Sequence, residues 1–295
     1  MLPASLFVAK VICRIILIIF ANSGVPSIEG MFISAQPLLN VEEMATLSDP
    51  PVLLCASMGP HPPARGIPGS YLADLEGDFS DPGSHLPHTA PAELTGLFES
   101  YGISDSSTVV VYDDQAGTAA PRVWWLALAA GLKNVYVLDG GLIAWRGNSG
   151  QVAEFSTPAS RGKIVSAPCP ELLLSADQIA DGNRLVLDAR SAERFHGRQP
   201  EPRPGLRGGH IPGSVNLPFT QVLDERGFFR PPAQLREALG EVVDKHRALT
   251  FSCGSGVTAC IDALAAIVAG YEDVAIYEGS WSEWGRPDSG RDVAR

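Results

Sequence analysis

The sequence predicts an α/β protein in which one unit of parallel strands and helices occurs twice. Strand-like runs alternate with helical runs, which is the pattern of parallel βαβ units. Identical residues in the two halves are separated by the same 139 positions: Gly117 and Gly256, Gly131 and Gly270, Trp145 and Trp284. Because this period is far longer than that of a solenoid repeat, it indicates two copies of one domain.

The first half supplies the elements of one copy in order. A buried strand is predicted for PVLLCAS at 51–57, and a turn for GIPGS at 66–70. A second strand, STVVVYDD at 107–114, leads into an apolar helix, QAGTAAPRVWWLALAAG at 115–131. VYVLDGGLIAW at 135–145 then gives a short β-branched strand and a turn.

The second half repeats these elements. RLVLDAR at 184–190 matches the first strand, and HIPGS at 210–214 matches the turn. The strand RALTFSC at 247–253 leads into a loop and an apolar helix, GSGVTACIDALAAIVAG at 254–270, where the final glycine is a suitable helix stop. VAIYEGSWSEW at 274–284 completes the copy.

Composition sets the expected boundaries. Residues 147–170 contain Gly, Ser and Pro without periodicity, so we interpret them as a linker between domain one at 31–146 and domain two at 171–290. Residues 1–30 form an N-terminal extension with three interpretations. They are translated from a misplaced start, with Met31 the true first residue, or they form a signal-like or anchor segment, or they pack as part of the protein.

Charge and cysteine content exclude several classes of protein. The net charge of −11 argues against nucleic acid or an anionic membrane surface as a partner, because both would repel the chain. The five cysteines show no C-x-x-C spacing, which argues against a disulfide framework or a metal site. We expect a reducing compartment, the cytoplasm, unless residues 1–30 direct the protein elsewhere.

The loop CGSGVTAC at 253–260 is the strongest candidate for chemistry. Cys253 lies where a strand ends and a helix begins, at the sheet edge where ligands bind in parallel α/β folds. Gly254 and Gly256 allow successive N–H groups to turn inward and form an anion site, which favours a thiolate. We interpret Cys260, Cys55 and Cys169 as structural.

A cysteine phosphatase is a competing interpretation of this loop. Phosphatases need an arginine six residues after the cysteine to hold phosphate, but that position is Ala259, and residues 248–285 contain no arginine. An arginine-rich loop lies elsewhere, between Arg190 and Arg207, with five arginines in eighteen residues. As a set these arginines favour an anion site, although each alone could pair with Glu193 or Glu201.

These motifs resemble the tandem-domain rhodanese family of sulfurtransferases, and within it the mercaptopyruvate-using members. The resemblance covers nearly everything from residue 32 on. It is carried by CGSGVTA at 253–259, DARSAERFHGRQPEPRPG at 188–205, GHIPGSVNLPF at 209–219, YEGSWSEWG at 277–285, APRVWW at 120–125 and LDGGLIAW at 138–145. It implies two rhodanese-like domains, each a five-stranded parallel sheet flanked by helices. Only the second is catalytic, since Asp114 takes the aligned cysteine position in the first.

The resemblance also implies roles for single residues. Cys253 is the nucleophile and carries sulfur as a persulfide, while Ser255 polarises or protonates the substrate. Arg194 and Arg203 bind the donor's carboxylate and keto group. The remaining substrate-binding residues lie in the cysteine loop: Gly254, Gly256, Val257 and Thr258. No organic cofactor and no metal are implied.

The function implied is transfer of sulfane sulfur from 3-mercaptopyruvate to cyanide or to a thiol, such as thioredoxin or a low-molecular-weight thiol, with release of pyruvate. Thiosulfate as donor is the alternative, but thiosulfate-using members carry positive residues where Gly254 and Ser255 stand here. A non-catalytic sulfur carrier or redox module is a third hypothesis. We expect a small-molecule donor, no nucleic acid and no stable membrane association.

One departure from the family pattern concerns the first domain. Its members usually carry a histidine in the segment HIPGA, and that histidine has been proposed to assist the serine. Here the position is Gly66. His61 and His85 lie nearby but are not aligned with it, so whether a histidine assists Ser255 stays open.

Overall fold

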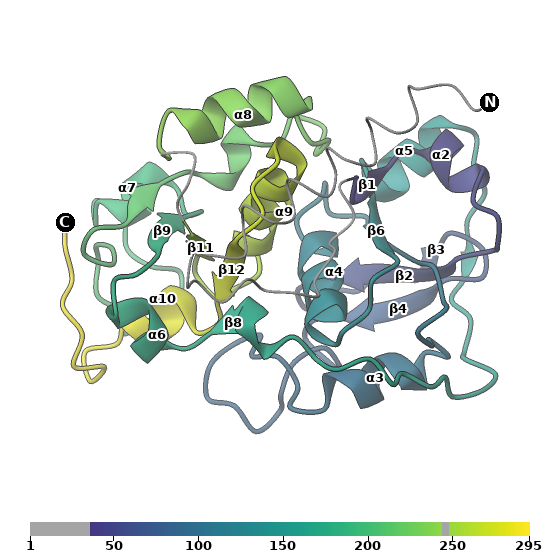
Figure 1. Cartoon of the computed structure of the whole chain (residues 1–295), viewed down its shortest axis with the longest axis horizontal. Helices are drawn as coiled ribbons and strands as arrows, with labels where there is room; N and C mark the ends of the chain where they lie inside the picture. Colours follow the sequence, from purple (N-terminus) through teal and green to yellow (C-terminus); the bar gives the residue numbers. More distant parts are fainter. Residues whose placement is uncertain (1–35, 244–247) are drawn as a thin grey trace, which may run out of the picture. The chain divides into compact units, whose positions relative to one another are not determined.

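The computed structural model describes residues 36–243 and 248–295. The interpretations of residues 1–30, including the misplaced start at Met31, lie outside the described residues. The described chain contains two five-stranded parallel sheets (Figure 1). The predicted α/β class, with a five-stranded parallel sheet in each half, is therefore confirmed.

The first sheet has the strand order β1-β6-β5-β2-β4. Its strands are β1 (Leu38–Leu39), β2 (Val52–Ser57), β4 (Tyr71–Asp74), β5 (Val109–Asp113) and β6 (Val135–Leu138). The helices of this half are α2 (Val41–Ala45), α3 (Leu94–Ser100), α4 (Ala120–Ala129) and α5 (Gly141–Gly147). The central strand β5 is buried along its whole length, as expected for a parallel strand covered on both faces.

The second sheet has the order β10-β9-β11-β12-β8. Read in reverse, this is the order of the first sheet with each strand replaced by its repeat. Its strands are β8 (Leu173–Leu174), β9 (Leu185–Asp188), β10 (Val215–Asn216), β11 (Leu249–Ser252) and β12 (Val274–Tyr277). The helices are η2 (Pro170–Leu172), α6 (Ala176–Ala180), α7 (Ala192–Phe195), η3 (Phe219–Gln221), α8 (Pro232–Gly240), α9 (Ala259–Ala269) and α10 (Ser280–Trp284). The identical topology supports the duplication predicted from the 139-residue offset.

A small antiparallel pair involves the predicted linker. Strand β7 (Ala153–Glu154) pairs with β3 (Arg65–Gly66), so part of 147–170 is hydrogen-bonded to the first half. The domain boundaries themselves stay a prediction.

The two halves meet through the helices that follow their central strands. Helices α4 and α9 pack against each other (Figure 1). Both are almost entirely buried, because each covers its own sheet and also faces the other half. Helix α9 ends at Gly270, whose φ of 97° gives the left-handed cap that the sequence predicts.

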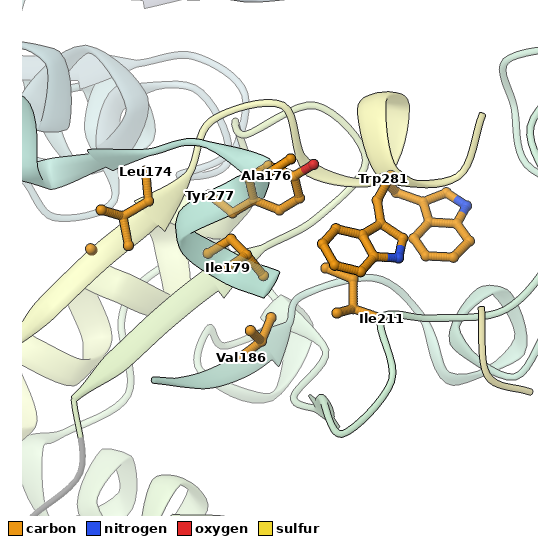
Figure 2. Packing of buried hydrophobic residues seen from close by; sticks show 9 residues of the cluster. Leu174, Ala176, Ile179, Val186, Ile211, Tyr277 and Trp281 are labelled. Carbon is orange, nitrogen blue, oxygen red and sulfur yellow. The ribbon is translucent and has the colours of Figure 1, made fainter. Parts of the chain in front are cut away.

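A hydrophobic cluster on the other face of the second sheet fixes helix α10. Figure 2 shows Trp281 beside Ile211 within this cluster, which also includes Tyr277 and Val186. The Trp281 side chain is fully buried, and its indole N–H donates to the Arg207 carbonyl at 2.9 Å. The start of α10 is thereby anchored in the core, and it is this start that supports the cysteine loop.

Candidate active site

The backbone of the Cys253 loop is anchored to helix α10. Cys253 follows β11 directly; its N–H donates to Ser280 Oγ at 3.1 Å, and its carbonyl accepts from Trp281 N at 3.0 Å. The Gly254 carbonyl accepts from both the N–H and the hydroxyl of Ser282, at 2.9 and 2.6 Å. These bonds fix the thiol at the carboxyl edge of the sheet, as predicted for a ligand-binding position.

The loop presents N–H groups without protein acceptors. Gly256 has a φ of 77°, the left-handed conformation that turns the chain into α9. Among the residues that the structure describes, no acceptor bonds the N–H groups of Gly254, Gly256, Thr258 or Ala259. Such a group of inward N–H donors before a helix is an anion site.

The first half shows what this arrangement binds. There the carboxylate of Asp113 accepts four backbone N–H groups at 2.8–3.0 Å. The donors are Gln115, Gly117, Ala119 and Ala120, which stand 139 positions before Gly254, Gly256, Thr258 and Ala259. In the second half the residue equivalent to Asp113 is the uncharged Ser252. The same donors are therefore left for an anion at Cys253.

Two arginines converge beside Cys253: Arg194 from helix α7, and Arg203 from the Pro- and Gly-rich loop that follows it. A Cβ atom placed on Gly254 would lie 3.2 Å from Arg194 Nη2 and 3.7 Å from Arg203 Nη1. Arg194 is oriented by the buried Glu201, whose Oε2 lies 2.6 Å from Nη2. Arg203 forms no ion pair with any residue in the described parts of the chain, so its charge is available for a ligand.

Of the other three arginines in the predicted set, Arg190 and Arg207 make structural contacts, whereas Arg198 is exposed. Arg190 is fully buried; it pairs with Asp188 at 2.6 Å and Glu201 at 2.8 Å, and its guanidinium stacks on Trp281. Because Glu201 bonds both Arg190 and Arg194, the buried network sets where Arg194 lies. The structure thus divides the predicted set: Arg194 and Arg203 lie at the site, and Arg190 supports it from below.

A histidine that sequence reasoning missed completes the site. His88, from the first half, places Nδ1 3.0 Å from Ser255 Oγ, and its Nε2 lies 3.1 Å from Glu76 Oε1. His88 is 8% exposed and adopts a φ of 57°, which is uncommon for a residue with a side chain. The histidine that the structure places within hydrogen-bond distance of Ser255 is therefore His88, and not His61 or His85.

The electrostatics of this triad favour a neutral imidazole and a charged carboxylate. Burial lowers the pKa of His88, with smaller contributions from Arg203 and Arg122, although hydrogen bonding to Glu76 acts in the opposite direction. Burial raises the pKa of Glu76, but the hydrogen bond and charge of His88 outweigh this, and the net pKa is below the ordinary value. Glu76 therefore holds the proton of His88 on Nε2, and Nδ1 can accept the Ser255 proton.

The remaining predicted residues occupy supporting positions. Val257 is 2% exposed and packs inside the loop, and Thr258 is the residue before α9. Cys260 lies in the core as predicted, donating to the Gly256 carbonyl, and burial raises its pKa to about 12. Burial likewise raises the pKa of Cys55 to about 12. Neither thiol is a competing nucleophile.

A cavity of about 300 Å³ opens beside Arg203. It is lined by both halves of the chain, with His85 and Pro87 from the first, and Arg203, Ser282 and Arg286 from the second. No group of His, Cys, Asp and Glu side chains in the described residues could hold a metal ion. No helix found in those residues is long and apolar enough to cross a bilayer.

Comparison with known proteins identifies the family. The rhodanese-like domain model matches residues 64–148 and 174–286, so the chain belongs to the rhodanese family. It is a sulfurtransferase of the tandem-domain type, as the motifs around Cys253 predict.

Several similar proteins are named 3-mercaptopyruvate sulfurtransferase, and two from Arabidopsis thaliana are named thiosulfate/3-mercaptopyruvate sulfurtransferase. The 3-mercaptopyruvate sulfurtransferase of Rattus norvegicus is 39% identical over 231 residues, which cover 75% of this chain and 77% of that protein. The 3-mercaptopyruvate sulfurtransferase of Escherichia coli K12 is 34% identical over 226 residues, covering 74% and 80%. Among solved structures, 3-mercaptopyruvate sulfurtransferase from Leishmania major superposes with a TM-score of 0.74 at 26% identity, covering 84% of this chain and 74% of that one.

Proposed function

We propose that this sulfurtransferase takes sulfur from 3-mercaptopyruvate, holds it as a persulfide on Cys253 and passes it to a thiol. The observation that carries the proposal is the convergence of Arg194 and Arg203 over Gly254, beside Cys253. A 2-keto acid has a carboxylate and a keto oxygen side by side, which suits two guanidinium groups with fixed donor geometry. The relatives named for this substrate support the same donor.

Binding places the donor sulfur over the thiolate. Arg203, which has no ion pair in the described structure, takes the carboxylate, and Arg194, held by Glu201, donates to the keto oxygen. The absence of a side chain at Gly254 leaves the room that these contacts need. Two adjacent charge-assisted contacts fix the direction of the substrate, which brings its sulfur into line with Cys253.

Sulfur transfer is a nucleophilic displacement. The Cys253 thiolate attacks the substrate sulfur, a sulfur–sulfur bond forms, and the carbon–sulfur bond breaks with its electron pair entering the enolate of pyruvate. The carbon of the enolate then takes one proton, and the substrate thiol releases one. Atoms and charge balance without a further reactant, because the proton that leaves sulfur equals the proton that carbon gains.

Ser255, His88 and Glu76 form the relay that moves this proton. Neutral His88 accepts a proton through Nδ1 from Ser255 while Glu76 holds the proton on Nε2. The hydroxyl of Ser255 can then take the proton of the substrate and return it to the enolate. Holding three groups in hydrogen-bond contact before substrate arrives removes the reorganisation that water would need.

The second half-reaction empties the site. The persulfide anion lies where the loop N–H groups have no acceptor among the described residues, in the position that a carboxylate takes in the first half. An acceptor thiolate attacks the outer sulfur and leaves Cys253 as a thiolate. The cavity of about 300 Å³ beside Arg203 is large enough for a low-molecular-weight thiol, and thioredoxin is the protein acceptor that we propose.

A cytoplasmic location forms part of this proposal. A thiolate that must be regenerated at each turnover needs a reducing compartment, which the cytoplasm supplies. Detection of the native protein in separated cell fractions tests this. Recovery in a membrane or secreted fraction would overturn it.

Steady-state turnover of the purified protein with 3-mercaptopyruvate and with thiosulfate, each with cyanide as acceptor, tests the function. We expect kcat/KM to be much higher with 3-mercaptopyruvate, and Arg194→Ala to reduce that reaction more than the thiosulfate reaction. A preference for thiosulfate would show that the arginine pair does not select the donor. A persulfide without repeated turnover would instead indicate a sulfur carrier.

A further inference from the structure

An ion pair between a buried arginine and a partly buried glutamate crosses between the two halves next to the active site. Arg122, on α4, is fully buried and donates through Nη1 and Nη2 to the two carboxylate oxygens of Glu278, at 3.0 and 2.7 Å. Glu278 directly follows β12 in the second half. Neither residue has a role in the proposed sulfur transfer, and a buried ion pair alone is weak evidence for stability.

Both members of the pair hold the backbone around His88. Arg122 Nη2 donates to the His88 carbonyl at 2.8 Å. Glu278 Oε1 accepts from the N–H of Ala90 at 2.6 Å. The pair therefore binds the segment on either side of the histidine, at the point where it passes from the first half to Ser255 of the second.

The duplicated domain supplies a comparison for this crossing. At the equivalent position, 139 residues before Glu278, the carboxylate of Asp139 accepts from the N–H of Phe229, which lies 139 residues after Ala90. A carboxylate that accepts a backbone N–H from the other half is thus present in both copies of the domain. However, Gly227 stands at the position of His88 and Ile261 at the position of Arg122.

Arg122 therefore occurs in the crossing that contains His88. The equivalent crossing, in which Gly227 replaces the histidine, has no arginine at the position of Arg122. His88 adopts a φ of 57°, a conformation that a residue with a side chain keeps only when its surroundings impose it. We infer that Arg122 and Glu278 are positioning residues, which hold the His88 backbone so that Nδ1 stays within hydrogen-bond distance of Ser255. This inference rests on the proposed function, because it assumes that the His88 relay serves sulfur transfer.

Two substitutions test the pair with different risks to folding. Arg122→Lys keeps a buried cation for Glu278 but lacks the forked donors that reach Glu278 and His88 together. Glu278→Gln keeps an acceptor for Ala90 but leaves Arg122 without a counter-charge. If Glu278→Gln unfolds, the pair Arg122→Met with Glu278→Leu removes both charges at once, which buried ion pairs tolerate better than loss of one partner.

The expected result is a loss in kcat of at least about tenfold with 3-mercaptopyruvate, because a displaced proton relay slows the chemical step. KM should change less than about twofold, since Arg194 and Arg203 are untouched. The rate of Cys253 alkylation by iodoacetamide should also be unchanged. Asp139→Asn is the matched control: it weakens the equivalent crossing on the side without a histidine, and it should keep kcat within about twofold of wild type.

A double-mutant cycle separates positioning from simple stabilisation. If Arg122 acts through His88, Arg122→Lys should cost nothing further in kcat once His88→Ala has removed the imidazole. Additive losses in the cycle, or equal losses in Arg122→Lys and Asp139→Asn, would overturn the inference. Failure of the proposed function is distinguishable, because the wild-type protein would then show no turnover of 3-mercaptopyruvate before any substitution is made.

Discussion

Replacing Gly254 by alanine should weaken substrate binding while leaving the fold and the thiol intact. The backbone of Gly254 lies outside the left-handed region, so an alanine fits there without strain. Its methyl group would lie 3.2 Å from Arg194 Nη2, which is closer than nine in ten real contacts of a Cβ atom, and 3.7 Å from Arg203 Nη1. Arg194 must therefore move, but the buried Glu201 holds it at 2.6 Å.

The size of the effect follows from what the methyl group displaces. It occupies the space in which both guanidinium groups reach the donor, so at least one charge-assisted hydrogen bond is lost, at about 1.5–3 kcal/mol. This free energy corresponds to a fall in kcat/KM of about 10- to 150-fold. Most of it should appear in KM, because the lost contact serves the bound substrate as well as the transition state.

Three measurements on Gly254→Ala test this reasoning. Steady-state kinetics with 3-mercaptopyruvate should show the rise in KM, while thermal unfolding and the alkylation rate of Cys253 should match wild type. Gly240→Ala is the matched control, because a Cβ at this last residue of α8 meets no atom within 4 Å. A kcat/KM for Gly254→Ala within about twofold of the control would refute the assignment of the substrate site to the two arginines.

Further predictions concern the relay, the free arginine and a buried carboxyl. Because burial lowers the pKa of His88 below its ordinary value of 6.5, kcat should stay constant to below that pH and fall only when the imidazole protonates. His88→Gln should abolish this acidic limb, and a limb that persists would assign it to another group. Arg203→Ala should reduce kcat/KM by about 10-fold or more, and added guanidinium should restore part of it; a loss of kcat alone would argue against carboxylate binding. Asp262, on α9, is fully buried without a hydrogen-bond partner among the described residues, and burial raises its pKa well above 3.8. The folded state therefore keeps a proton that the unfolded chain releases, so Asp262 lowers stability as pH rises above 3.8. Asp262→Leu should raise the free energy of unfolding at pH 7 by about 1–3 kcal/mol in urea titrations, and a decrease would mean that the carboxyl has an unseen partner.

The fold could be predicted because its signals are local and repeated. Parallel strands such as Val109–Asp113 are continuous apolar runs, and helix α9 ends at Ala269, directly before the predicted stop at Gly270. The repeated motifs, which share an offset of 139 residues from Gly117 to Trp145, then predicted that the two sheets share a topology. Short edge strands such as Arg65–Gly66 and Ala153–Glu154 carry no such pattern, since two residues cannot show a periodicity.

The catalytic loop could be predicted for a related reason. A cysteine after a strand, followed by glycines and an apolar helix, is a local pattern, so a few consecutive residues are enough to predict the geometry of the loop. One detail differs from expectation: Gly256 has the left-handed backbone, whereas Gly254 is small because Arg194 and Arg203 come close to it. The sequence shows that a glycine is present, but it does not show whether the fold needs the left-handed backbone or the absence of a side chain.

The relay could not be predicted, because it depends on a contact between residues 167 positions apart. His88 has no motif of its own, and it stands three residues after His85, which lies in the cavity wall instead. Its position is set by the segment that crosses between the halves, and that segment is held by Arg122 and Glu278. The contact between Asp139 and Phe229 shows that the same crossing occurs in both copies of the domain, and this can be seen only in the three-dimensional structure.

The most direct test of the account is a single turnover without an acceptor. The protein is mixed with one equivalent of 3-mercaptopyruvate, the pyruvate released is measured, and the thiols are mapped by mass spectrometry after alkylation. The account predicts one equivalent of pyruvate and one added sulfur atom on Cys253, with both products abolished in Cys253→Ser. Sulfur found on Cys169 or Cys260, or pyruvate released by Cys253→Ser, would contradict it.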